Sequence, residues 1–172
     1  MESRAQGKAQ SGQEQGEYLL RPIGTIRSPI KEVADDCWGG VRSVIELDAT
    51  RFSPECTRGL EEFSHLEVIF LLDRIRPESV LTGAKHPRER RDWPKVGVFA
   101  QRTKNRPNRI GVTVCKIEAV RGLQISVREL DAVDGTPVLD IKPYIEEFGP
   151  REPVRQPAWS RELMAGYFRA KK

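Results

Sequence analysis

A cationic loop between two apolar stretches is the most chemically suggestive part of the sequence. It follows an apolar run, Val96 to Ala100, that predicts a buried strand, and it ends at Gly111, where a strand pattern resumes. Its basic residues are Arg102, Lys104, Arg106 and Arg109. Four cations in one short loop repel one another unless an anion binds, so the loop predicts an anion-binding site.

Several other polar residues have more than one interpretation from sequence alone. A second basic cluster, Lys85 to Arg91, lies in the long connection before the cationic loop and could bind RNA or be solvated surface. The residues Arg106-Pro107-Asn108 and Asp134-Gly135 also fit ordinary turns. His65 fits either a ligand contact or a partly buried histidine with a protein partner. No single motif therefore decides the function.

Composition narrows the class of protein. The chain has 172 residues, 38% hydrophobic and 31% charged, with a net charge of +4, which favours one basic, water-soluble domain. No apolar run is long enough for a membrane span, and no signal peptide is visible at the N-terminus. Three scattered cysteines predict reduced thiols in the cytoplasm and no metal site. The sequence contains no Gly-x-Gly-x-x-Gly, Walker or Gly-x-Ser-x-Gly motif.

The elements that must position these residues are mostly short strands. Alternating apolar residues predict strands over 41–47, 68–72 and 138–141, with a hairpin over 112–130. A short helix is expected from Pro54 and is interrupted at Gly59, after which Leu60, Phe63 and Leu66 have helical spacing; a C-terminal helix is expected over 157–169. These elements predict a mainly β fold, a small antiparallel barrel with short helices. The expected divisions are a disordered tail (1–17), the barrel (18–150) and a linker with the helix (151–172).

Five sequence words occur in an order that resembles the TrmO family, also called TsaA-like or YaeB-like. They are Arg58 to Leu66, His86-Pro87-Arg88, Val98 to Gly111, Asp134 to Pro137 and Asp140 to Tyr144. The resemblance covers about 19–150. It implies a barrel that binds S-adenosylmethionine outside the Rossmann class. It further implies a homodimer with sites near the subunit interface, and methylation of N6 of threonylcarbamoyladenosine in tRNA.

The resemblance also implies a set of cofactor contacts. In relatives, a His-Leu pair and an arginine after the Phe-Ala strand contact the cofactor. The matching positions here are His65, Leu66, Arg102, Val112 after Gly111, the turn Asp131, Ala132, Val133 and Asp134, and the early loop Asp36, Cys37 and Trp38. Many relatives have Pro-Arg-Gln in the early loop. A guanidinium such as Arg102 can pair with the carboxylate of the methyl donor, while Leu66 and Val112 can cover its adenine.

The methylated nitrogen in that family bears a carbonyl substituent, so we expect a base or polarising group to assist loss of its proton. The candidates by motif are Asp140, Lys142 and Tyr144, and the sequence does not choose among them. The candidate substrate contacts are Arg88, Arg106 and Asn108. Two alternatives stay open: a methyltransferase of the same fold with another substrate, and a non-catalytic barrel that binds RNA.

Overall fold

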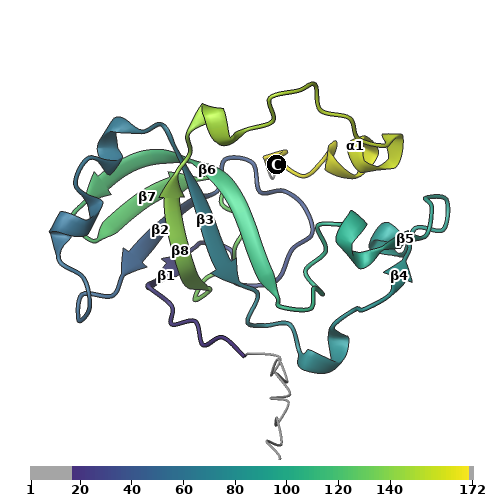
Figure 1. The fold of residues 1–172 in the computed structure, drawn as a ribbon, viewed down its shortest axis with the longest axis horizontal. Coiled ribbons are helices and arrows are strands. Elements are labelled where there is room, and N and C mark those ends of the chain that lie inside the picture. The colour runs from purple at the N-terminus through teal and green to yellow at the C-terminus, as the bar shows by residue number, and fades with distance from the viewer. Residues whose placement is uncertain (1–16, 171–172) are drawn as a thin grey trace, which may run out of the picture.

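Six antiparallel strands close into a barrel, which forms the centre of the fold (Figure 1). The computed structural model describes residues 17–170, so the predicted tail lies outside the described residues apart from Glu17. Around the barrel the strands follow the order β1-β2-β7-β6-β3-β8. Their bounds are Gly24–Arg27 (β1), Arg42–Leu47 (β2), His65–Leu71 (β3), Ile110–Arg121 (β6), Gln124–Arg128 (β7) and Pro137–Pro143 (β8). The predicted class, a small mainly β barrel, is confirmed.

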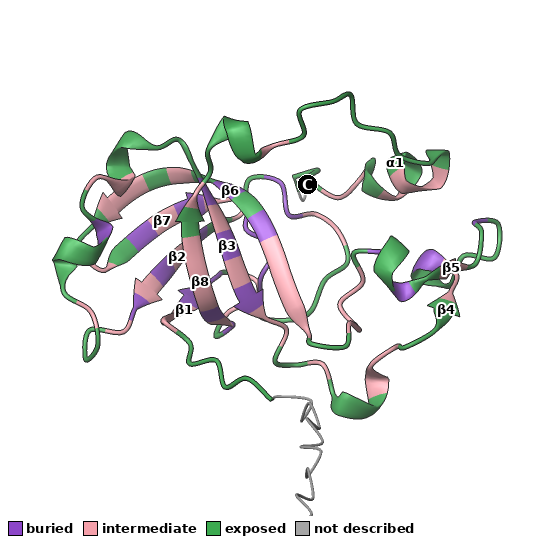
Figure 2. Ribbon diagram, in the orientation of Figure 1, coloured by how far each residue is buried: buried purple, intermediate pink, exposed green. Residues whose placement is uncertain are grey.

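Alternating side chains fill the barrel interior, as the banded strands in Figure 2 show. In β2, Ile45 and Leu47 point inward and are buried, while Val44 and Glu46 on the other face are only half-buried. Burying an aliphatic side chain of this size stabilises the fold by about 1.5–3 kcal/mol. The fully buried aliphatic residues are Ile26, Ile45, Leu66, Val68, Ile125, Val127, Leu130 and Val138. Because the interior is filled by side chains, any ligand site must lie at an end or on the outside.

Antiparallel pairing brings alternate strand ends together at each end of the barrel. Strands β1, β3 and β7 finish where β2, β6 and β8 begin, as the pairs Leu71 with Ile110 and Arg128 with Arg42 show. Three connections, residues 28–41, 72–109 and 129–136, leave this end, which we call the long-loop end. His65 at the start of β3 and Tyr144 after β8 lie at the opposite end. There the Tyr144 amide donates to the His65 carbonyl oxygen over 3.0 Å.

The connection 72–109 forms a lobe beside the barrel (Figure 1). Its two-stranded sheet pairs β4 (Ala84–Lys85) with β5 (Val96–Gly97), and short 3-10 turns occupy Pro77–Ser79, Pro87–Glu89 and Val98–Ala100. The predicted buried strand over Val96 to Ala100 is therefore wrong beyond Gly97. Val98 is buried, whereas Phe99 is 80% exposed, because the 3-10 turn rotates successive side chains away from a common face.

The predicted helix after Pro54 is also different. Two 3-10 turns, Pro54–Thr57 and Leu60–Glu62, flank Gly59, whose φ of 85° breaks any continuous helix. Leu66 does not follow them on a helical face. It belongs to β3, where it pairs with Cys115 of β6 and Pro143 of β8. Strand partners on both sides outweigh the three-residue spacing of Leu60, Phe63 and Leu66.

The C-terminal helix α1 spans Ala158–Met164, five residues less at its C-terminal end than predicted. After it the chain turns back, and its last described residues lie between the barrel and the lobe (Figure 1). Gly39 and Ala170 form an isolated β-bridge there. Among residues 17–170, no helix is both long and apolar enough to cross a bilayer.

Candidate functional site at the long-loop end of the barrel

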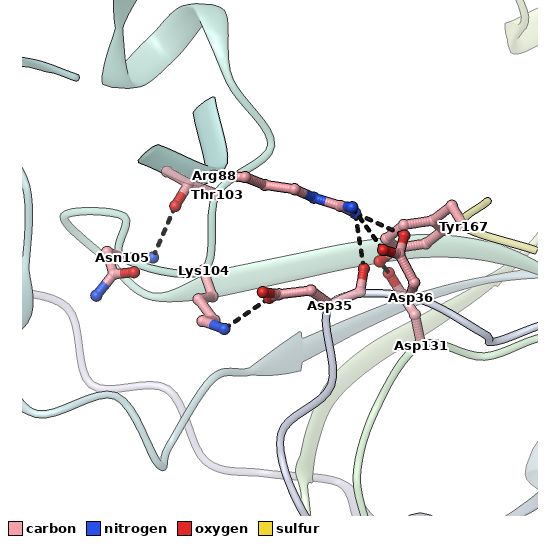
Figure 3. Close-up of polar contacts among 8 residues, drawn as sticks. All are labelled: Asp35, Asp36, Arg88, Thr103, Lys104, Asn105, Asp131 and Tyr167. Carbon is pink, nitrogen blue, oxygen red and sulfur yellow. Dashed lines mark hydrogen bonds and ion pairs between the residues drawn. The ribbon is translucent and has the colours of Figure 1, made fainter. Parts of the chain in front are cut away.

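An ion pair joins two of the predicted residues across the long-loop end. The Arg88 guanidinium donates from Nη1 and Nη2 to the two carboxylate oxygens of Asp36, over 2.5 and 2.6 Å (Figure 3). Nη2 also donates to the Asp35 carbonyl oxygen over 2.9 Å. The Asp36 carboxylate raises the pKa of Arg88 further above its usual range. Arg88 was predicted to bind substrate, yet here its charge holds the early loop against the lobe.

A second ion pair attaches the cationic loop to the same early loop. Lys104 Nζ lies 2.8 Å from Asp35 Oδ1. The hydrogen bond from Lys104 is the main reason why the pKa of Asp35 is lowered. Two cations from one connection, Arg88 and Lys104, therefore meet two consecutive acids from another. The sequence gives no local spacing signal for this pairing, since the partners are far apart in the chain.

Unusual backbone conformations cluster around these ion pairs. Cys37, Arg88 and Glu89 have positive φ angles of 69°, 49° and 60°. Left-handed conformations are unfavourable for residues with a Cβ, and they persist only where surrounding contacts hold them. Arg88 is a member of the Arg88–Asp36 pair, and Cys37 directly follows Asp36 in the chain. The strain makes this part of the long-loop end a candidate for function.

A half-buried hydrogen-bond network lies beside the ion pairs. Asp131 accepts hydrogen bonds from the Thr113 hydroxyl on one carboxylate oxygen and from the Tyr167 hydroxyl on the other. Burial and the adjacent Asp131 carboxylate raise the pKa of Tyr167, against smaller opposite effects of Arg102 and Arg88. The phenol therefore stays protonated and acts as a donor. Figure 3 shows Tyr167, Asp131 and the Arg88–Asp36 pair in one group.

The rest of the cationic loop divides into residues that hold the loop and residues that remain exposed. Arg106 donates to the Gln101 carbonyl oxygen over 2.6 Å, and Arg109 donates to that of Ile75 over 2.9 Å. Arg102 is exposed and donates to the backbone oxygen of Val112 in β6. Asn108 is exposed in the turn. Arg102 and Asn108 are therefore the members of the loop best placed to meet a ligand.

Of the four residues predicted in the 129–136 turn, only one turns its side chain toward the candidate site. Ala132 and Val133 are buried, so their side chains pack against the barrel. Asp134 lies 2.7 Å from Lys31 Nζ and accepts the Ser28 amide over 2.9 Å. Its pKa is lowered, mainly by the hydrogen bond from Lys31. Within this turn Asp131 is the carboxylate that faces the other candidate residues.

The remaining predicted residues lie away from this group. His65 is exposed at the opposite end, where Nδ1 is 2.8 Å from the Ser64 hydroxyl. Leu66 is fully buried in the barrel, so its side chain does not cover a ligand within this chain. Tyr144 follows β8 at the same end. His65 begins β3, and Ile69 follows it four residues later, about 13 Å further along the extended strand.

The three candidate catalytic residues lie on one strand and just beyond it. The carboxylate of Asp140 pairs with Lys142, and its Oδ1 also accepts the Ile141 amide over 2.9 Å. The Asp140 hydrogen bond raises the pKa of Lys142. Two surface concavities contain none of the predicted site residues: one is lined by residues between Glu146 and Arg151, the other by residues of 22–27 and 46–48. Within one chain, Tyr144 lies at the opposite end from the long-loop cluster, whereas Asp140 pairs with Ile69 of β3, which also pairs with Val112 of β6.

Two polar groups at the long-loop end can form hydrogen bonds in addition to those that they make with the described residues. The Trp38 indole N–H is buried and has no acceptor among the described residues, although the Trp38 amide donates to the Tyr167 carbonyl oxygen. A carboxylate has about four acceptor positions, and Asp131 uses two of them. The buried indole donor fits a ligand that carries an acceptor, and Asp131 fits a ligand that carries an amine or hydroxyl.

The fold and the site define the class as a small closed barrel, outside the Rossmann type, with a polar cluster of loops at one end. The chain belongs to the family described as the tRNA-methyltransferase O N-terminal domain, whose model matches residues 32–149. The resemblance stated from the sequence words is therefore confirmed.

Relatives and solved structures agree with this assignment. A probable S-adenosyl-L-methionine-binding protein of Pyrococcus abyssi is 41% identical over 139 residues, 78% of this chain and 72% of that protein. A tRNA (adenine(37)-N6)-methyltransferase of Mus musculus is 36% identical over 149 residues, 83% of this chain but only 34% of that enzyme. The crystal structure of TrmO from Pseudomonas aeruginosa matches with a TM-score of 0.65 and 30% identity, over 81% of this chain and 62% of that one. The chain thus spans about a third of the mouse enzyme.

Proposed function

We propose that this protein is an S-adenosylmethionine-dependent methyltransferase that modifies N6 of an adenosine in tRNA. The observation that carries the proposal is family membership together with the polar cluster at the long-loop end. The names of its relatives, an S-adenosyl-L-methionine-binding protein and a tRNA (adenine(37)-N6)-methyltransferase, give the cofactor and the substrate class. We also propose that the protein acts in the cytoplasm, where it would meet such a substrate.

The residues of the cluster suit the two ends of the methyl donor. Arg102 keeps N–H donors beyond the one that it gives to Val112, and a guanidinium pairs well with a carboxylate. Asp131 has acceptor positions left for an amine or a ribose hydroxyl, and Trp38 offers its indole N–H to an acceptor. Bound S-adenosylmethionine supplies an electrophilic methyl group, so that a C–S bond breaks as the new N–C bond forms.

The chain's own contribution to the rate is chiefly positioning. The early loop, the cationic loop and the 129–136 turn are fixed to one another by the Arg88–Asp36 and Lys104–Asp35 pairs. Fixed loops hold their ligands in one orientation, which lowers the entropic cost of bringing the reactants together. Exposed cations such as Arg102 and Arg91 lie near the same end and suit the phosphates of RNA.

We further propose that the adenosine methylated by this protein is N6-threonylcarbamoyladenosine. Its N6 bears a carbonyl group and is a weak nucleophile, so its proton must leave before or during methyl transfer. Asp140, Lys142 and Tyr144 are our candidates for removing or polarising that proton. The Lys142–Asp140 pair gives a charged couple at the barrel surface that suits this role. The threonyl carboxylate would meet the basic residues of the cationic loop.

A homodimer is part of the proposal, because it would solve the separation seen within one chain. Of the candidate base group, Lys142 and Tyr144 lie toward the same end of the barrel as His65, and the donor-binding cluster lies at the other end. In a two-fold dimer both copies use the same patch, within which residue i of one copy meets residue j of the other, so a patch that runs along the barrel can bring the opposite end of one copy to the long-loop end of the second. Phe99, which is 80% exposed beside the cluster, is an apolar residue available for such a contact.

The test combines binding with product analysis. Calorimetry should detect binding of S-adenosylmethionine by the purified protein, and an RNA-only barrel would give no heat. The protein is then incubated with the cofactor and tRNA that does or does not carry threonylcarbamoyladenosine, and the nucleosides are analysed by mass spectrometry. Methylation only of the modified tRNA supports the full proposal. Methylation of neither tRNA, despite cofactor binding, would assign the protein to another substrate.

A further inference from the structure

The segment after residue 156 lies across three separate parts of the candidate site. We call residues 157–170 the C-terminal strap. At one point its Glu162 accepts the Trp93 indole N–H over 2.8 Å, and its Trp159 ring lies 6.4 Å from that of Trp93. At another, the Tyr167 carbonyl oxygen accepts the Trp38 amide over 2.9 Å. The strap is thus attached both to the lobe and to the early loop.

The third attachment reaches the site itself. The Tyr167 hydroxyl donates to one oxygen of Asp131, while Thr113 of β6 donates to the other. Rotation of the carboxylate is blocked when both of its oxygens are held by donors from different segments. Both donors are neutral hydroxyls, so the negative charge of Asp131 is left for a further partner.

The surrounding charges favour the same arrangement. Figure 3 shows Tyr167 next to Asp131 and the Arg88–Asp36 pair. Tyr167 packs edge-to-face on Phe168, with ring centroids 5.0 Å apart, which fixes the ring. No such role for Tyr167 is predicted from the sequence, because its spacing from Trp159 and Leu163 is that of a packing stripe on a helix.

We propose that Tyr167 is a positioning residue of the methyl-donor site: its hydroxyl holds the Asp131 carboxylate in the orientation that receives the donor. This inference rests on the proposed function, because it takes the long-loop cluster as the donor site. It goes further in making the strap part of that site. Binding of the donor and docking of the strap then stabilise each other, since linkage between two such events is reciprocal.

The protein carries its own probe for strap docking. Its three tryptophans are Trp38, Trp93 and Trp159, and each either belongs to the strap or contacts it. Intrinsic fluorescence therefore reports the environment of the strap without any added label. The experiment titrates S-adenosylmethionine into the full chain, following both tryptophan fluorescence and calorimetric heat.

Three variants separate the contributions. Tyr167→Phe keeps the ring and removes only the hydroxyl, and we expect the donor to bind about tenfold more weakly, as for one hydrogen bond to a charged group. Tyr18→Phe is the matched control, because Tyr18 is 90% exposed, and its affinity should equal that of the parent protein. Glu162→Ala loosens the strap far from Asp131, and it should weaken binding by a smaller factor.

A double-mutant cycle distinguishes positioning from a general structural effect. If Tyr167 acts through Asp131, Tyr167→Phe costs no further affinity in an Asp131→Ala background, which has no side-chain acceptor for the hydroxyl. Additive losses, or an unchanged affinity of Tyr167→Phe in a protein that binds the donor, would overturn the inference and leave the proposed function intact. Absence of donor binding by the parent protein would overturn both together.

Discussion

Arg88 and Asp36, which are 52 residues apart in the chain, form a two-bonded ion pair at the long-loop end of the barrel. Both side chains are about one-third exposed, 28% and 34%, so the pair is partly protected from water. Arg88 holds this contact from a left-handed backbone conformation, with φ of 49°. The pair thus fixes the loop that contains Cys37 and Trp38 against the lobe.

The first prediction is that lysine cannot replace Arg88. A lysine keeps the charge but cannot form the paired bonds to both oxygens of Asp36. We expect Arg88→Lys to lower the free energy of unfolding by about 1 kcal/mol, and to weaken S-adenosylmethionine binding by loosening the early loop. Thermal denaturation and calorimetry measure the two effects. Arg91→Lys, on an exposed residue of the same cluster, is the control. Equal behaviour of the two variants would remove Arg88 from the site.

A second prediction concerns the exposed guanidinium of the cationic loop. Arg102→Ala should weaken S-adenosylmethionine binding by about 10- to 100-fold, the range for losing a hydrogen-bonded charge pair. The melting temperature should change little, because Arg102 is exposed and bonds only a backbone oxygen among the described residues. Arg121→Ala, in the turn at the opposite end, should bind like the parent protein. Unaltered affinity of Arg102→Ala would refute the proposed carboxylate contact.

Much of the barrel could be predicted because its strands leave a local signal. The alternation of Ile45 and Leu47 with polar neighbours identified β2, and the Arg121-Gly122 turn identified the β6–β7 hairpin. Leu66 shows where a local signal misleads. Its spacing from Leu60 and Phe63 fits a helix, but pairing with strands distant in sequence decides its conformation. The spacing of residues that are close in sequence does not reveal which distant strands will pair.

The candidate site could be predicted only as separate pieces. A sequence word contained Arg88, and the family resemblance implied Asp36 and Asp131, yet nothing in either showed that Asp36 and Arg88 neutralise each other. Tyr167 was missed entirely, because a helical stripe explains its position and the structure ends the helix at Met164. A half-buried tyrosine beside a half-buried carboxylate is recognisable only once the turn after α1 brings them together. The sequence does not reveal which distant charges will pair, nor that the chain reverses direction after α1.

Cysteine reactivity offers a third prediction. Burial raises the pKa of the Cys115 thiol to about 12, so it carries almost no thiolate at pH 8 and should resist alkylation in the native protein. Cys56 is exposed and should react readily, while half-buried Cys37 should react more slowly. S-adenosylmethionine should protect Cys37 but not Cys56, as mass spectrometry of iodoacetamide adducts would show. Unprotected Cys37 would place the donor away from the early loop.

The same thiol gives a pH dependence of stability. The folded state holds the Cys115 proton more tightly than the unfolded chain, in which the thiol titrates near pH 8.5. Its contribution is therefore fully present below about pH 8.5 and declines as the pH rises toward 12. Cys115→Ala should reduce the loss of stability between pH 8 and pH 10, measured by urea unfolding. Parallel stability profiles for the two proteins would contradict this.

A fourth prediction concerns docking of the strap. A Cβ at Gly39 would overlap the carbonyl oxygen of Phe168, so Gly39→Ala must displace either the early loop or the strap. We expect faster tryptic cleavage within the strap and a loss of about 1–3 kcal/mol in stability, as for other overpacked sites. Gly83→Ala is the control, because no atom lies within 4 Å of a Cβ placed there and its φ is not positive. Equal cleavage rates would indicate that the strap contact is dispensable.

The separation of the two residue groups gives the last prediction. Suppose that each site combines the long-loop end of one subunit with the opposite end of its partner. Arg102→Ala then damages the part of the site that one subunit supplies, and Tyr144→Phe damages the part that the other subunit supplies. Each variant alone should lose most activity. Mixing them in equal amounts should restore about a quarter of the parental activity, because half of the dimers are mixed and each of those has one intact site. A mixture of Arg102→Ala with Arg102→Ala/Tyr144→Phe, which cannot form an intact site, is the control. No recovery on mixing, in dimers shown to exchange subunits, would mean that each subunit works alone.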